Sequence, residues 1–199
     1  MIEITPVIEV PWTEEGYQWP WLITSKKAFS FLRLDSISND HLGTFFAALC
    51  CDDNPDSIDS CIELITEADG LIVSGGLALS LAETSIFPSC CCGLENWIEW
   101  KAFLDNGSSP WMGHDPSAWA EIKGDQVVVW TDGGGTDSAN RIGPCISVPI
   151  KDFECALIKA EKQLQIFFSA LPSWLKSVGY SDPTDIMEKI GGEFHIQSR

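Results

Sequence analysis

Alternation of apolar and polar residues predicts the strands of this chain. Residues Glu3 to Val10 alternate, so Ile4, Ile8 and Val10 share one face of a predicted strand. Pro6 favours an edge position or an interruption of that strand, because proline cannot donate a ladder hydrogen bond. Further strands are predicted at Phe29–Leu34, Leu71–Ser74, Leu77–Ala82, Gln126–Thr131 and Cys145–Ile150, with a Gly75-Gly76 turn between the second and third of these.

Apolar residues three and four positions apart predict the helices. The clearest such stripe follows Asp152, a good N-cap residue, and includes Phe153, Leu157 and Leu164. Pro172 is expected to end this helix, which then covers about residues 152–171 and is about 30 Å long. Shorter helices are predicted after Ser38 or Asn39, from Asn54-Pro55 to Gly70, over Leu94–Asp105 and near Pro183–Ile190.

Strands and helices are mixed along the chain rather than strictly alternating. Such an order favours an α+β fold with a mainly antiparallel sheet and helices packed against it. With 199 residues, the chain is long enough for one well-buried core and marginal for two domains. We therefore predict a single globular α+β domain over residues 1–199.

The chain is strongly acidic. It has 29 acidic and 12 basic residues, a net charge of −17, and no lysine or arginine lies between Leu34 and Trp100. Such a surface repels nucleic acids and anionic membranes, and it attracts a basic protein or a cation. We therefore expect no nucleic-acid partner and take a basic protein as the candidate partner. The alternative is an acidic surface that has no partner.

The sequence favours a cytoplasmic protein. It has no run of about 18 apolar residues that would span a membrane. The N-terminal residues Met1 to Pro6 include an acid and lack the basic stretch of a secretory signal peptide. Eight cysteines without such a signal indicate reduced thiols. We expect a cytoplasmic location without membrane contact, and the sequence leaves the oligomeric state open.

Three adjacent cysteines, Cys90, Cys91 and Cys92, precede the single histidine of their region, His114. As zinc ligands they lack the paired Cys-x2–4-Cys spacing. A nucleophilic thiol needs a lowered pKa, which the N-terminus of the following helix favours and the neighbouring acidic side chains oppose. We predict that these thiols pack in a strand or turn, with no metal, no cofactor and no catalytic residue. A metal- or thiol-dependent enzyme that uses the Cys90–Cys92/His114 cluster remains the alternative.

The glycine-rich segment Asp132–Asp137 has two carboxylates that could coordinate Ca²⁺. It lacks the EF-hand spacing and the distal glutamate, and it lacks the lysine of a phosphate-binding loop. We predict that this segment is a hairpin connection.

Aromatic residues flank a turn-rich loop that follows the cysteines. Trp111 and Trp119 lie on either side of Gly113-His114-Asp115-Pro116. Aromatic side chains on loops are typical of binding hot spots, although they also attach a loop to its own core. We predict a binding surface formed by Trp111, His114, Asp115 and Trp119, with the cysteines packed behind it.

Residues Gly124 to Leu171 resemble the SMI1/KNR4 (SUKH) superfamily of immunity and regulatory proteins. The resemblance consists of strand Gln126–Thr131, a glycine-rich turn, strand Ile146–Ile150 and the run Lys151-Asp-Phe-Glu-Cys-Ala-Leu157. That run is similar to the S-F-E-E-F-L helix start of the family, with Asp152 in place of the serine, and the family's opening helix-and-proline motif is missing. The resemblance implies an α+β fold and an acidic surface that neutralises a toxin.

Charge and resemblance lead to the same functional hypothesis. We predict a non-enzymatic acidic binding protein, immunity-like, that binds a basic protein such as a nuclease toxin. An enzyme built on the Cys90–Cys92/His114 cluster is the first alternative, and enzymatic activity is left open. A globular domain whose cysteine and tryptophan cluster is simply core is the second.

Overall fold

The computed structural model describes residues 1–13, 17–50, 55–133 and 141–196, and it confirms the predicted α+β class. Strands form a four-stranded sheet with the order β2-β1-β3-β4 and a three-stranded sheet with the order β5-β6-β7. The strands are β1 (Glu3–Glu9), β2 (Phe31–Arg33), β3 (Gly75–Leu81), β4 (Thr84–Ile86), β5 (Trp119–Lys123), β6 (Gln126–Asp132) and β7 (Ile142–Pro149). The helices are α1 (Asn39–Leu49), α2 (Ile58–Glu67), the 3₁₀ turn η1 (Leu94–Ile98), α3 (Glu99–Asn106), α4 (Ile150–Ser177) and α5 (Thr184–Glu193).

Contacts divide the chain into two compact units. The first unit consists of Met1–Pro6 and Ser74–Lys162, and the second consists of Val7–Val73 and Gln163–Arg199. Strand β1 and helix α4 therefore each contribute residues to both units. The single globular domain over residues 1–199 stays a prediction.

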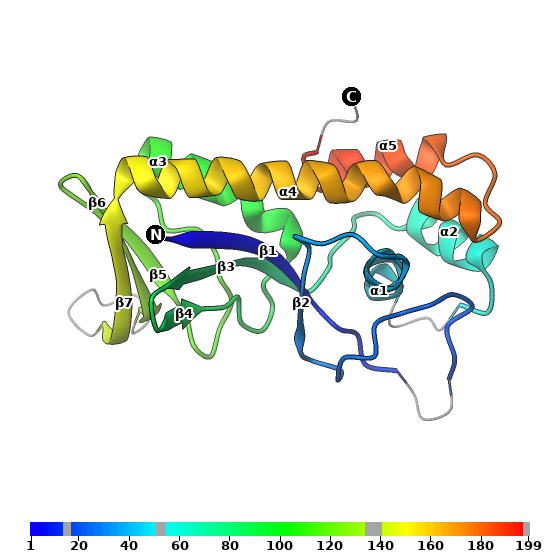
Figure 1. Cartoon of the computed structure of the whole chain (residues 1–199), viewed down its shortest axis with the longest axis horizontal. Helices are drawn as coiled ribbons and strands as arrows, with labels where there is room; N and C mark the ends of the chain where they lie inside the picture. Colours follow the sequence, from blue (N-terminus) through cyan, green and yellow to red (C-terminus); the bar gives the residue numbers. More distant parts are fainter. Residues whose placement is uncertain (14–16, 51–54, 134–140, 197–199) are drawn as a thin grey trace. The chain divides into compact units, whose positions relative to one another are not determined.

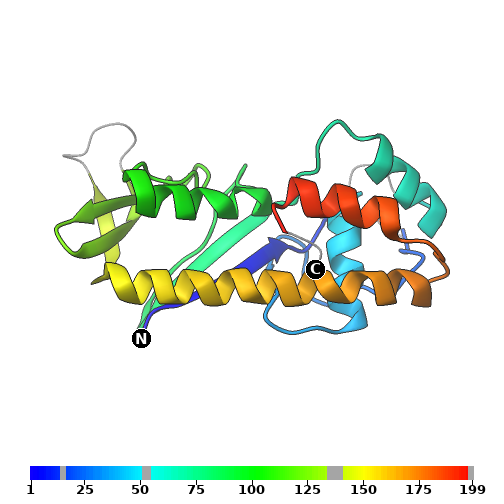
Figure 2. The ribbon, with the colours of Figure 1, turned by 90° about the horizontal axis from the view of Figure 1, so that it is seen from above.

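In the first unit, helix α3 packs against the beginning of α4. Trp100 and Phe103 of α3 have ring centroids 5.3 Å and 6.4 Å from Phe153 of α4, and all three side chains are buried. Lys101 and Glu161 add an ion pair of 2.7 Å between the same helices, which lie side by side in Figures 1 and 2. One face of the β5-β6-β7 sheet supplies further core residues of this unit: Ala120, Val127, Val129, Ile146 and Val148.

In the second unit, aromatic residues of α1, α4 and the C-terminal region form the core. Phe45 of α1 has no exposed surface, and its ring lies within 6.0 Å of four other aromatic rings: Phe46, Phe167, Phe168 and Phe194. This arrangement confirms the helical stripe predicted after Ser38. Helix α5 packs beside α2, and the Lys189 ammonium donates 2.8 Å to the Thr66 carbonyl near the end of α2.

The strand predictions need three corrections. Gly75 and Gly76 lie inside β3 and not in a turn, because φ values of 154° and 147° let these glycines continue a strand. Residues 71–74 form no strand, and β3 turns instead into β4. Strand β2 is shorter than predicted because Phe29 has a φ of 61°. Pro6 lies within β1, an internal strand, although the β1–β2 pairing begins only at Val7.

The helix predictions need two corrections. Helix α2 begins after Ser57, which forms a capping box with Ser60, and it ends before Ala68 and not at Gly70. The predicted cap Asn54 lies outside the described residues. Helix α4 begins directly after β7 at Ile150, two residues before Asp152, and continues through Pro172 to Ser177. Buried apolar residues on both sides of Pro172, such as Leu171 and Trp174, favour continuation of the helix despite the missing amide.

Candidate functional site

The cysteine segment pairs with the tryptophan loop through the main chain. The Ser89 amide donates 2.9 Å to the Met112 carbonyl, and the His114 amide donates 3.1 Å to the Cys90 carbonyl. Cys90 and His114 thus form an isolated antiparallel bridge. The Ser89 hydroxyl also lies 2.8 Å from the carbonyl oxygen of Pro116. Two segments more than twenty positions apart in the sequence are therefore held together by backbone groups.

Trp111 is anchored at both of its N–H groups and still exposes much of its ring. Its backbone amide donates 2.6 Å to Glu99 Oε2, and its indole Nε1 donates 3.1 Å to the Cys91 carbonyl. The ring meets the His114 imidazole edge-on at a centroid distance of 4.8 Å. Because 40% of the Trp111 surface remains exposed, the structure holds a large aromatic side chain in a fixed position at the surface.

The structure brings three of the four predicted binding residues together. Trp111, His114 and Asp115 are all exposed on one loop. The exposed side chains of Cys90 and Cys91 lie beside them, and we call these five residues the Trp111 surface. Trp111, His114 and Asp115 are therefore exposed neighbours on one loop of the first unit. The carboxylate of Glu99 also belongs to its surroundings, since it accepts the Trp111 amide.

Trp119, the fourth predicted residue, is part of β5 and faces a different set of neighbours. Its ring lies 5.7 Å from the Arg141 guanidinium, and it is paired across the strands with Trp130. Burial alone would raise the pKa of Glu121, but hydrogen bonds from Arg141, Lys123 and Trp130 outweigh burial and hold it at about 2. This polar cluster was not among the predicted site residues, although the period-two spacing of residues 119, 121 and 123 along a strand places their side chains on one face.

The three cysteines differ in their surroundings. Cys92 is buried, and its Sγ donates to the Trp111 carbonyl at 3.5 Å. Burial raises the pKa of the Cys92 thiol to about 12, and the nearby carboxylates of Glu95 and Glu99 add to the rise. The predicted packing role is thus confirmed for Cys92. Cys90 and Cys91 are exposed, so for them the prediction of thiols packed behind the loop is wrong.

The geometry of Cys90 and Cys91 does not resemble an activated nucleophile. Cys90 Sγ lies 3.6 Å from the backbone oxygen of His114, which does not withdraw its proton as an imidazole would. A hydrogen bond between the two thiols raises the pKa of Cys91. The hollow beside Cys92, which Pro88 and Trp97 help to line, has no space for a water molecule.

We expect Cys92 to react with iodoacetamide at least a hundredfold more slowly than Cys155, which is exposed on α4. A pKa of about 12 leaves about one Cys92 thiol in ten thousand ionised at pH 8, and burial blocks access as well. Peptide mass spectrometry of the native protein over a time course measures both rates. Equal rates would contradict the buried, inert thiol and would favour the enzyme alternative.

The described part of the chain shows neither a metal-binding cluster nor a membrane-spanning helix. Within it, no three histidine, cysteine, aspartate or glutamate side chains are arranged to hold a metal ion. The Ca²⁺ alternative for Asp132–Asp137 is untested, since residues 134–140 lie outside the described ranges. Of the helices described, none combines the length and the apolar character needed to cross a bilayer.

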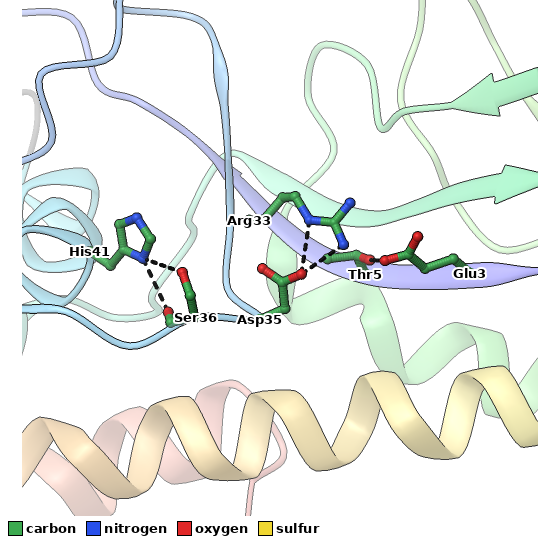
Figure 3. Close-up of polar contacts among 6 residues, drawn as sticks. All are labelled: Glu3, Thr5, Arg33, Asp35, Ser36 and His41. Atoms are coloured by element: carbon green, nitrogen blue, oxygen red, sulfur yellow. Dashed lines mark hydrogen bonds and ion pairs between the residues drawn. The ribbon is translucent and has the colours of Figure 1, made fainter. Parts of the chain in front are cut away.

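The other two histidines of the chain belong to the second unit. His41 Nδ1 lies 3.0 Å from the Ser36 hydroxyl and 3.1 Å from its carbonyl oxygen (Figure 3). Nearby in the sequence, Arg33 forms an ion pair of 2.7 Å with Asp35. Figure 3 also shows Thr5 of the first unit pointing toward Glu3 on the same strand. These contacts are local, because each joins residues at most five positions apart in the sequence.

Comparisons with protein-family models, with curated proteins and with solved structures found no match to this chain. The resemblance of residues 124–171 to the SUKH superfamily therefore stays a prediction.

Proposed function

We propose that this chain is a non-enzymatic acidic binding protein, immunity-like, whose Trp111 surface contacts a basic protein such as a nuclease toxin. One observation carries the proposal: Trp111 is anchored by hydrogen bonds of its backbone amide and its indole N–H, and it remains 40% exposed on the loop that also exposes Asp115. The surface belongs to a chain whose net charge is −17.

The anchoring of Trp111 favours tight contact. A side chain that is already fixed loses little conformational entropy when a partner binds, so more of the contact energy appears as affinity. Tryptophan is also the aromatic ring that binds lysine and arginine best through its face. The chain shows this interaction internally, because the Lys101 ammonium lies 5.0 Å from the Trp97 ring centroid. A basic partner can supply an equivalent cation to Trp111.

The acidic charge of the chain supports the choice of a basic partner. Complementary charge accelerates the encounter of two proteins and disfavours acidic competitors. In the second unit, α2 and its flanks expose a row of carboxylates that adds to this field: Asp56, Asp59, Glu63, Glu67 and Asp69. Association is therefore expected to slow as salt is added, since exposed charges are screened.

Replacement of Trp111 by alanine should weaken binding to a basic protein at least tenfold, about 1.4 kcal/mol. The test titrates the full chain against a catalytically inactivated basic nuclease, lysozyme and polylysine, at low and at moderate salt. Trp12→Ala is the matched control, since Trp12 is 56% exposed in the second unit and lies outside the Trp111 surface. Its affinity should equal that of the unmodified chain.

Two outcomes would overturn the proposal. One is that none of the three basic probes binds at low salt. The other is that Trp111→Ala and Trp12→Ala weaken binding equally, which would place the contact elsewhere. If binding does not depend on salt but is lost in Trp111→Ala, the Trp111 surface is still the contact, and the argument from charge is refuted.

The thiol-enzyme alternative has less support. Its chemistry requires a thiolate, and the pKa of Cys92 is raised while Cys90 contacts a backbone oxygen. If the chain converts a thiol-reactive substrate and the Cys90→Ser variant does not, the enzyme alternative is favoured over the binding role.

A further inference from the structure

Two buried cysteines of the second unit are in direct contact. Cys50, directly after the last residue of α1, and Cys61 of α2 are 2% and 0% exposed. Their Sγ atoms lie 2.6 Å apart. A disulfide bond is about 2.05 Å long, whereas non-bonded carbon atoms, which are smaller than sulfur, approach to about 3.5–4.0 Å. The two sulfurs are therefore closer to bonding distance than to ordinary packing distance.

The surroundings fix this pair in place. The Cys50 amide donates 3.2 Å to the Ala47 carbonyl, which sets the end of α1. Cys61 lies on the buried face of α2 beside Ile62 and Ile65. Tyr17 covers the same region, since its hydroxyl donates 2.5 Å to the Pro55 carbonyl. Burial raises the pKa of Tyr17, and negative charge on either thiol adds to the rise, as expected for close neighbours.

We propose that Cys50 and Cys61 are a disulfide-forming site that joins the end of α1 to α2. The inference is independent of the proposed binding function, because both residues belong to the second unit and the Trp111 surface belongs to the first. The bond closes the loop between positions 50 and 61. Such a crosslink restricts the unfolded chain and stabilises the folded unit.

The oxidant is a small-molecule disulfide such as oxidised glutathione. The thiolate of one cysteine attacks the small disulfide, forms a mixed disulfide and releases one small thiol. The thiolate of the second cysteine then attacks the sulfur of the first cysteine in the mixed disulfide. The protein disulfide forms, and the second small thiol is released. Two protein thiols lose two hydrogens in total, and one small disulfide is reduced to two thiols. Because both cysteines are buried, the first step requires a local opening of the unit and is slow.

The test incubates the native full chain with excess oxidised glutathione and digests it at aspartate without reduction. Cleavage before Asp40, Asp52, Asp59 and Asp69 places the two cysteines on separate peptides, 40–51 and 59–68. We expect these peptides to be joined, with a mass two hydrogens below their sum. We also expect the melting temperature to rise by roughly 5–10 °C, and dithiothreitol to reverse both changes.

Cys51→Ser is the decisive control, because Cys51 shares a peptide with Cys50. The crosslink should persist in Cys51→Ser and disappear in Cys50→Ser and in Cys61→Ser. Cys51→Ser alone shows whether Cys50 is the cysteine in the crosslink, even if a buried serine prevents folding of the other two variants. Absence of the 40–51/59–68 crosslink in the oxidised native chain, or its loss in Cys51→Ser, overturns the proposal.

Discussion

Replacement of Phe45 by alanine is expected to lower the free energy of unfolding by about 3–5 kcal/mol. Phe45 has no exposed surface and contacts aromatic rings from three parts of the second unit. Its truncation removes apolar burial and leaves a cavity that large rigid rings such as Phe167 and Phe194 fill poorly. Urea unfolding followed by tryptophan fluorescence measures the loss.

Phe29→Ala is the matched control for this prediction. Phe29 is 68% exposed in the same unit, so its truncation should change the free energy of unfolding by less than about 0.5 kcal/mol. A loss below about 1 kcal/mol for Phe45→Ala would contradict the aromatic core described above. Two resolved unfolding transitions, only one of them shifted by Phe45→Ala, would contradict the predicted single domain.

Elements with a long, regular apolar period could be predicted from the sequence, and exceptions arose from single residues. The stripe with Phe45 and Phe46 correctly predicted α1, and the continuous apolar run at residues 127–130 indicated β6 equally clearly. The pair Gly75-Gly76 is typical of a turn in sequence, but both glycines, with φ values of 154° and 147°, belong to a strand. Pro172 resembles a helix end, yet tertiary packing overrides this local preference.

The candidate site was predictable only in part. Clustering along the sequence was enough to single out Trp111, His114 and Asp115, which the structure places on one exposed loop. Sequence proximity could not separate buried Cys92 from exposed Cys90, because the difference depends on pairing across more than twenty positions. The same holds for two other contacts, Cys50 with Cys61 and Arg141 with Trp119. Neither gives a local pattern in the sequence.

Gly113→Ala is expected to destabilise the first unit by about 2–4 kcal/mol and to disorganise the Trp111 surface. Gly113 has a φ of 95°, and a Cβ there would lie 2.5 Å from the Cys90 carbonyl oxygen and 2.6 Å from that of Ser89. Those two backbone groups belong to the segment that pairs with Met112 and His114. A methyl group at position 113 therefore forces the two segments apart.

The loss of pairing should be visible at Trp111 as well as in stability. When the segments separate, the indole loses its hydrogen bond to Cys91, so the fluorescence of Trp111 should shift to longer wavelength. Gly107→Ala is the matched control, since Gly107 also has a positive φ of 77° but nothing lies within 4 Å of an added Cβ. Gly107→Ala should cost only the backbone strain, about 1–2 kcal/mol, and leave the fluorescence unchanged. If the two variants are equally stable and equally fluorescent, close approach at Gly113 does not hold the loop against the cysteine segment.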